Sequence, residues 1–268
     1  MSKSAYARAF RAEVPRPPPP ERIRRPITLF LSPHLDDAAL SLGALIASLP
    51  AGEATVATCF TADVAGDDRM AARRGEDVLA CSLLGADFEH LDLPDAPARG
   101  YDTPASLTGD LDPADAVAPA LEAGLRDLLR ARAPHTVCSP LGVGEHVDHR
   151  RVIAAVARVR DDFPGVRWLR WYDQPALARH RRRYPELSFA RRVRGLAEVG
   201  DDACALAFAP PAREPDGPLA RKLRAAAAYA SQVDTHFYEA QGLTRADEPD
   251  VEAQIARVLG RREWVTAG

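Results

Sequence analysis

Positive net charge and long apolar runs are both missing from this sequence, and each absence argues against a class of protein. The formal net charge is -3 over 268 residues, so no overall positive field draws the chain to nucleic acid or to an anionic membrane. No run of about 18 apolar residues occurs, as a membrane-spanning helix would need. The first residues also lack the apolar segment of a secretory signal. We therefore expect a cytoplasmic protein with neither nucleic acid nor membrane as partner.

Cysteine is scarce as well, and no CxxC pair occurs. The four cysteines lie mostly in apolar runs, which predicts free, buried thiols rather than a disulfide framework or a cysteine metal site. They are Cys59, Cys81, Cys138 and Cys204. The glycine-rich Gly-x-Gly-x-x-Gly pattern is absent after the first expected strand, which argues against a dinucleotide site.

Proline is concentrated near the N-terminus. Residues 15–20 read Pro-Arg-Pro-Pro-Pro-Pro, which favours extended polyproline geometry and cannot join a helix. We expect residues 1–26 to form an arm and residues 27–268 to form one α/β domain, since the sequence shows no internal repeat and no second boundary.

Short apolar, β-prone runs alternate with helical periodicity through most of the chain. This alternation predicts parallel strands with helices on both faces, a Rossmann-like three-layer α/β sandwich with a mostly parallel central sheet. Residues 94–115 are expected to form a long loop, and such loops are often functional. Strands are expected at 27–31, 54–60, 88–93, 136–139, 166–172 and within 196–209, and helices at 38–49, 69–84, 116–133, 146–160, 218–232 and 247–264.

Two polar clusters follow expected strands. The first is His34-Leu35-Asp36-Asp37, and the second is His146-Val147-Asp148-His149, after the strand that ends near Ser139. Ligands of parallel α/β sheets bind outside the carboxyl ends of the strands. We therefore expect the two clusters to meet in space, although more than a hundred residues separate them.

Histidine and carboxylate together are good ligands for zinc, and a catalytic zinc keeps three protein ligands beside an open position. In each cluster two candidate ligands stand three residues apart, which places them on one face at the start of a helix. The clusters hold more candidates than three ligands require. The surplus suits hydrolysis, which also needs an acid/base group and a stabiliser of the oxyanion.

These residues resemble the signatures of a known family. Ser32-Pro33-His34-Leu35-Asp36-Asp37 resembles the His-Pro-Asp-Asp motif of the PIG-L or LmbE-like deacetylases, and the second cluster resembles their His-x-x-His motif. The resemblance extends over about residues 27–235 and implies a zinc-dependent N-deacetylase. Weaker matches in the family's order are Arg73-Arg74-Gly75-Glu76, Leu84-Gly85-Ala86, Leu91-Asp92-Leu93-Pro94-Asp95, Lys222 to Tyr229 and Ser231-Gln232.

The resemblance also implies a role for each residue of the two clusters. Asp36 would be the general base, and His146, when protonated, would stabilise the oxyanion. Asp148 would pair with His146 and hold it charged. The implied zinc ligands are His34, Asp37 and His149, with Fe²⁺ or another divalent ion as the alternative, because these donors suit several metals.

The chain departs from the family pattern at three points. Leu35 replaces the usual proline, Ala38 replaces a frequent acidic residue, and Val143-Gly144-Glu145 holds no tyrosine where some relatives have one. None of these changes removes an implied ligand. The missing phenol leaves part of the oxyanion site unassigned.

Residues for substrate binding are expected at other strand ends. Arg73 resembles a family position that contacts substrate, and Asp95 is placed to accept hydrogen bonds from sugar hydroxyls, with a turn role as the alternative. Four residues near the strand at 166–172 are candidates to line a pocket, with core packing or a subunit interface as the alternative for the tryptophans. They are Trp168, Trp171, Tyr172 and Asp173.

Simpler interpretations of the two clusters remain open. Acidic residues after a strand often cap a helix. On the same fold the chain would then be a non-catalytic sugar- or nucleotide-binding protein, and another alternative is a different metal hydrolase such as a phosphoesterase. The resemblance favours an N-acylated small molecule, most simply an N-acetyl amino sugar, as substrate, and it is compatible with a homo-oligomer.

Overall fold

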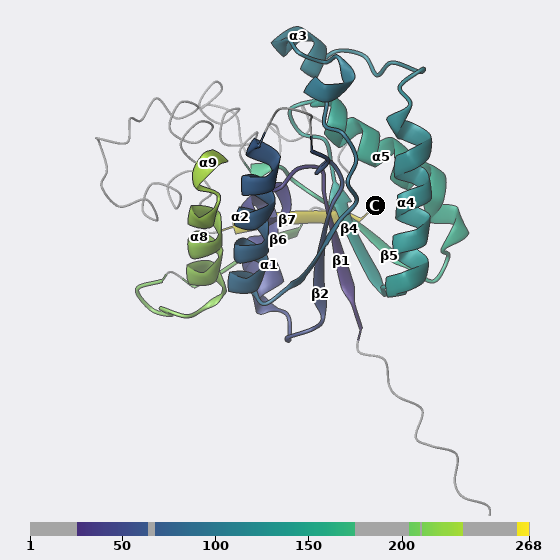
Figure 1. Ribbon diagram of the computed structural model, residues 1–268. Helices are drawn as coiled ribbons and strands as arrows, with labels where there is room; N and C mark the ends of the chain where they lie inside the picture. The colour runs from purple at the N-terminus through teal and green to yellow at the C-terminus, as the bar shows by residue number, and fades with distance from the viewer. Residues whose placement is uncertain (1–25, 64–67, 175–203, 210, 233–261, 268) are drawn as a thin grey trace, which may run out of the picture.

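The computed structural model describes residues 26–63, 68–174, 204–209, 211–232 and 262–267, and in this part of the chain the strands form a single sheet (Figure 1). Its order is β3-β2-β1-β4-β5-β7-β6. The first five strands of this order pair in parallel, whereas β7 is antiparallel to both β5 and β6. The strands are β1 Thr28–Ser32, β2 Ala54–Thr58, β3 Asp87–His90, β4 Thr136–Pro140, β5 Arg167–Trp171, β6 Cys204–Ala207 and β7 Arg262–Ala267.

Helices cover both faces of the sheet. Helices α1, α2 and α8 pack together on one face, and α4 and α5 pack on the other (Figure 1). The predicted three-layer sandwich with a mostly parallel sheet is confirmed. The helices are α1 Asp37–Ser48, α2 Arg69–Leu84, α3 Pro104–Leu107, α4 Val117–Arg132, α5 Val147–Val159, α8 Pro218–Ala228 and α9 Ala230–Gln232, with 3-10 turns at Pro97–Arg99 and Arg160–Asp162.

Most of the predicted elements lie where the sequence patterns place them. Strand β1 is buried along nearly its whole length, as expected for a parallel strand covered on both faces. Helix α2 ends at Leu84 because Gly85 adopts a left-handed φ of 74°, which glycine does at no steric cost. The expected loop at 94–115 carries a 3-10 turn and the short helix α3.

Helix α1 follows the first polar cluster and contains a kink. Leu42 has non-helical dihedral angles, and beyond it the N–H groups of Ala44 and Leu45 each donate to the Glu263 carboxylate at 2.8 Å. Lys222 Nζ lies 2.7 Å from the same carboxylate, and both side chains are 1% exposed. A carboxylate from β7 thus caps the second half of α1, where helical N–H groups have no partner in the helix.

The predicted helix at 247–264 is wrong for its last three residues. Arg262, Glu263 and Trp264 belong to strand β7, and residues 247–261 lie outside the described residues. The segment Trp264-Val265-Thr266 is β-prone, and β7 is held between β5 and β6 by pairing with residues far away in sequence. Helical spacing read along the tail cannot detect such pairing.

Three further predictions concern the N-terminal arm, the cysteines and membrane-spanning segments. Residues 1–25 of the expected arm lie outside it, and the division into an arm and one domain stays a prediction. Cys59, Cys81 and Cys138 are free and buried, as predicted. Within the described residues no helix is both long enough and apolar enough to cross a membrane.

Candidate metal centre

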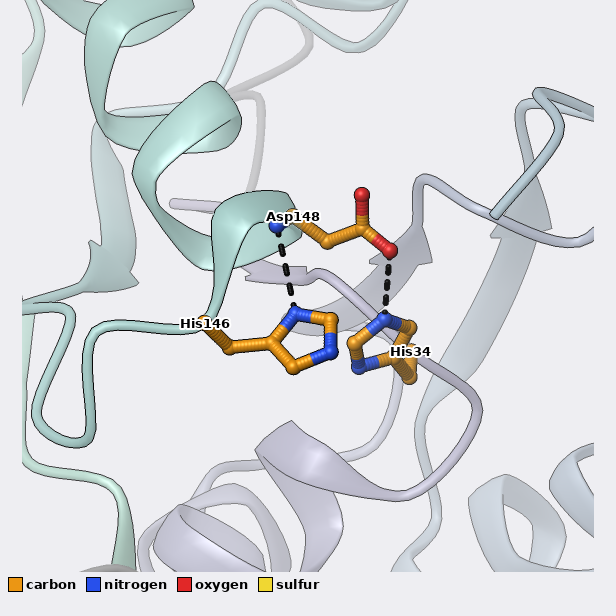
Figure 2. A group of neighbouring side chains, drawn as sticks. All are labelled: His34, His146 and Asp148. Atoms are coloured by element: carbon orange, nitrogen blue, oxygen red, sulfur yellow. Dashed lines mark hydrogen bonds and ion pairs between the residues drawn. The ribbon is translucent and has the colours of Figure 1, made fainter. Parts of the chain in front are cut away.

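The structure brings the two polar clusters together at the carboxyl ends of neighbouring strands. Strands β1 and β4 pair in parallel, so the residues that follow them meet at one edge of the sheet. His34 stands between β1 and α1, and His146 is the N-cap of α5. The rings of His34 and His146 face each other edge to face, with centroids 4.9 Å apart (Figure 2).

Three ligand atoms converge at this edge in a way that suits a metal ion. Asp37 Oδ2 lies 3.2 Å from His34 Nδ1 and 3.1 Å from His149 Nε2. A tetrahedral zinc with bonds of about 2.0–2.1 Å needs neighbouring ligand atoms roughly 3.3 Å apart. The donor types and their spacing therefore fit a zinc ion held by these three side chains.

The remaining ring nitrogens of the two histidines face carboxylates. His34 Nε2 lies 2.9 Å from Asp148 Oδ2, and His149 Nδ1 lies 3.5 Å from Asp173 Oδ2. Metal-bound histidines commonly donate their second N–H to a carboxylate, which fixes the ring and its tautomer. In the neutral ring, a hydrogen bond from His34 Nε2 to Asp148 leaves Nδ1 with the lone pair that a metal needs.

Asp148 does not pair with His146 through its carboxylate, contrary to the sequence-based expectation. Its backbone N–H instead donates to His146 Nδ1 at 3.2 Å, as Figure 2 shows. The reason is the helix start, where the N-cap side chain accepts from the backbone N–H of the second or third helical residue. The Asp148 carboxylate instead contacts His34 through Oδ2 and accepts a hydrogen bond from Arg99 at Oδ1, 2.8 Å away.

The electrostatics of the three candidate ligands favour a bound cation. Burial alone would lower the pKa of His34, but the carboxylates of Asp148 and Asp37 outweigh it and raise the pKa well above its ordinary value. Burial would raise the pKa of Asp37, but the charge of His149 and hydrogen bonds to both histidines hold it well below its usual range. The site therefore collects positive charge against its carboxylates even without an ion.

Asp36 stands beside this group with a different environment. Its partial burial, reinforced by the charge of Asp37, raises the pKa of Asp36 to about 7, while the nearby charge of Arg73 opposes the rise. Arg73 thus lies close enough to Asp36 to act on its charge. The Nε atom of Arg73 is buried and has no hydrogen-bond partner within the described part of the chain.

The remaining candidates for substrate binding lie in a turn or pack in the core. Asp95 Oδ1 accepts a hydrogen bond from the N–H of Ala98 at 3.3 Å, which agrees with the turn alternative. Trp171 is fully buried in the core, with its ring 6.4 Å from that of His149. Trp168 is half-buried and packs under α4 and α5.

Two contacts of the site were not assigned from the sequence. Asp173 was expected to line a pocket, yet it lies against His149. Its position just after β5, at the same edge of the sheet as the two clusters, could have indicated this contact. Arg99 was not singled out at all, because nothing in the local sequence of the long loop marks it as the partner of Asp148.

Comparisons with known proteins find similarity to deacetylases. Residues 29–159 match the family model described as PIG-L: GlcNAc-PI de-N-acetylase. The 2'-N-acetylparomamine deacetylase of Streptomyces fradiae is 40% identical over 149 residues, which are 51% of this chain and 53% of that protein. The chain thus aligns with about half the length of this curated relative.

Solved structures show the same fold at lower identity. The A40926 pseudoaglycone deacetylase is 23% identical with a TM-score of 0.61, covering 91% of this chain and 97% of that one. The zinc-inhibited form of teicoplanin deacetylase is 20% identical with a TM-score of 0.60, covering 89% and 96%. Both polar clusters lie inside the segment that matches the family model. Over this segment, just under half of the 268-residue chain, the sequence resembles the PIG-L family.

Proposed function

We propose that this chain is a zinc-dependent hydrolase that removes the acetyl group from the nitrogen of an amino sugar. The observation that carries the proposal is the convergence of His34 Nδ1, Asp37 Oδ2 and His149 Nε2, with Asp36 beside them. The family match and the deacetylase activity for which the Streptomyces fradiae relative is named support the reaction and the substrate class.

The metal would be held by His34, Asp37 and His149. When bound, zinc lowers the pKa of water and polarises the acyl carbonyl. Asp148, which is hydrogen-bonded to His34, would keep that ring oriented toward the ion, and the carboxylate of Asp173 faces His149 at 3.5 Å. Fe²⁺ or another divalent ion is the alternative, because the same donors suit several metals.

Asp36 acts as the general base. A carboxylate with a pKa of about 7 is close to the working pH, where a group both accepts and releases a proton efficiently. Asp36 takes the proton from the attacking water and delivers it to the nitrogen of the departing amine. The positive charge of Arg73 keeps a fraction of Asp36 ionised and ready to accept.

His146 donates a hydrogen bond to the oxygen that becomes negative in the transition state. Burial and the charge of His34 lower the pKa of His146 to about 4, so the ring is neutral near pH 7. The proposal therefore uses a neutral imidazole in place of the protonated one expected from the sequence. Because Nδ1 accepts the N–H of Asp148, the ring proton stands on Nε2, where it serves as the donor.

The two alternative functions lack comparable support. A phosphoesterase with two metal ions needs a second ligand set about 4 Å away. Among the described residues, the other group that could hold an ion, His34, His146 and Asp148, shares His34 with the first group, and Arg99 and the N–H of Ala96 already contact the oxygens of Asp148. Glu145 is exposed in a tight turn with a φ of 59°. A protein that only binds sugar needs neither Asp36 nor His146 at such a site.

The proposal also assigns two residues, Arg73 and Asp95, to substrate binding. Arg73 stands beside Asp36 and is placed to bind the sugar next to the scissile amide. Asp95 is retained as a contact for sugar hydroxyls although its carboxylate also serves its own turn. The partner of the chain is thus a small N-acetylated molecule.

An assay of amine release tests the proposal. The zinc-loaded protein is incubated with N-acetylglucosamine, with 2'-N-acetylparomamine and, as a counter-substrate, with p-nitrophenyl phosphate. We expect free amine from at least one N-acetyl sugar, suppression by a chelator and no phosphate release. Chelator-independent sugar binding without amine release would support the binding protein, and phosphate release would support the phosphoesterase.

A further inference from the structure

Asp148 is a fully buried carboxylate whose three partners come from two parts of the chain. Its side chain is 0% exposed, and a buried charge must be paired and hydrogen-bonded. Oδ2 faces His34 Nε2 at 2.9 Å and accepts the N–H of Ala96 at 3.0 Å. Oδ1 accepts from Arg99 Nη2 at 2.8 Å. The orientation of the carboxylate that faces His34 therefore depends on Arg99.

Arg99 is itself held from several directions. Its Nε atom donates to Asp115 Oδ2 at 3.2 Å, and Nη1 donates to the carbonyl of Pro94 at 2.7 Å. The guanidinium carbon lies 5.1 Å from the ring centre of Phe60 and 5.5 Å from that of Tyr101. The planar fork of arginine suits such fixed, multiple pairing, which lysine cannot reproduce.

The far end of this series of contacts is also fixed. Asp115 Oδ2 faces Arg151 Nε at 3.3 Å and the hydroxyl of Tyr101 at 3.4 Å, and Oδ1 accepts the N–H of Val117. Asp115 stands directly before α4, and Arg151 belongs to α5. The contacts Asp115–Arg99–Asp148–His34 thus run from the helical scaffold to a candidate metal ligand.

Arg99 acts on the site from outside it. Asp148 stands between Arg99 and His34, and Arg99 also lines a cavity of about 550 Å³ together with Tyr101 and Asp115. We propose that Arg99 is a positioning residue for metal binding, which holds the Asp148 carboxylate so that His34 donates from Nε2 and keeps Nδ1 for the ion. The inference rests on the proposed function, because it requires that His34 be a metal ligand.

The test compares Arg99→Lys and Arg99→Met with Arg126→Met. Arg126 is a matched control because it is also an arginine paired with an aspartate, Asp162, at 2.8 Å. It lies on α4, is more exposed than Arg99, and its partner does not belong to either polar cluster. The zinc dissociation constant is measured by competition with a chromogenic chelator. The geometry of the site is followed in the absorption spectrum of bound Co²⁺, which is intense when the ion is tetrahedral.

We expect Arg99→Met to weaken zinc binding about 10-fold, the lower end of the range for groups that orient a ligand, and to reduce the Co²⁺ absorption. Arg99→Lys should recover part of the affinity, because its charge remains but its fork is lost. Arg126→Met should match the wild type in both measurements. A merely structural role would lower stability with and without zinc alike and leave the dissociation constant unchanged.

A second variant covers the case in which Arg99→Met fails to fold. Asp115→Asn loosens Arg99 while leaving both Arg99 and Asp148 in place, and a several-fold loss of zinc affinity is expected. If both Arg99→Lys and Asp115→Asn keep the zinc affinity and the Co²⁺ spectrum of the wild type, this inference is overturned but the proposed function is not. Failure of the wild type to bind Zn²⁺ or Co²⁺ would instead overturn the proposed function.

Discussion

His34 Nε2 and Asp148 Oδ2 lie 2.9 Å apart, and this contact joins the two sequence clusters. It leaves His34 Nδ1 directed toward Asp37, where His149 also points. The second motif therefore contributes twice to the proposed metal site. His149 supplies a candidate ligand, and Asp148 orients a candidate ligand of the first motif.

Replacing Asp148 by Asn should weaken the proposed metal site. The variant loses the anion that accepts from His34, and we expect zinc affinity to fall by about 10–100-fold. It also removes one of the two buried carboxylates that pair with Arg99, while Asp115 remains, which should lower the free energy of unfolding by roughly 1–3 kcal/mol. Chelator competition and chemical denaturation measure the two effects.

The matched control for this variant is Asp162→Asn, which removes the half-exposed partner of Arg126. Exposed ion pairs contribute little, so the change in unfolding free energy should stay within about 1 kcal/mol. Unchanged zinc affinity in Asp148→Asn would contradict the orienting role of the carboxylate.

Asp36→Asn should separate catalysis from metal binding. The variant keeps the three proposed ligands but removes the group that accepts and returns the proton, so turnover should fall by about 10²–10⁴-fold. Amine release and zinc content are measured on the same preparation. Normal turnover, or loss of the metal together with activity, would show that the role of Asp36 is assigned wrongly.

His146→Asn tests the oxyanion donor while sparing the helix. Asn is as good an N-cap as any residue, so α5 should keep its start, but the shorter side chain cannot place a donor where Nε2 stands. The turnover number should fall by about 10²–10³-fold with little change in zinc content. A variant with full activity would assign the oxyanion site to other residues.

The buried pair of Lys222 and Glu263 should matter for stability rather than for chemistry. Lys222→Met leaves the Glu263 carboxylate buried without its cation beside the kink of α1, which should lower the free energy of unfolding by roughly 3–5 kcal/mol. Adding Glu263→Gln should restore much of this loss. Arg224→Met on the same helix, whose partner Asp216 is almost fully exposed, should cost less than about 1 kcal/mol.

The parts of the fold that sequence patterns predicted are those that local periodicity encodes. Helix α2 and its end at Gly85 needed only apolar spacing and one glycine. Strand β7 was missed because it is held by pairing with β5 and β6, neither of which is near it in sequence.

The same distinction applies to the site. His34, Asp37 and His149 stand in short motifs at strand ends, so their meeting could be predicted. The partners of Asp148 could not, because Arg99 and Ala96 lie about fifty residues away on a loop without a motif. The lowered pKa of His146 depends on burial and on the charge of His34, which no local pattern expresses.

The metal content of the purified protein, measured beside that of His149→Ala, tests the central claim most directly. The proposed site predicts about one zinc or similar divalent ion per wild-type chain and its loss in the variant. A fully folded wild-type protein that contains no metal, and takes up none when Zn²⁺ is added, would contradict the claim that this chain is a metal-dependent hydrolase.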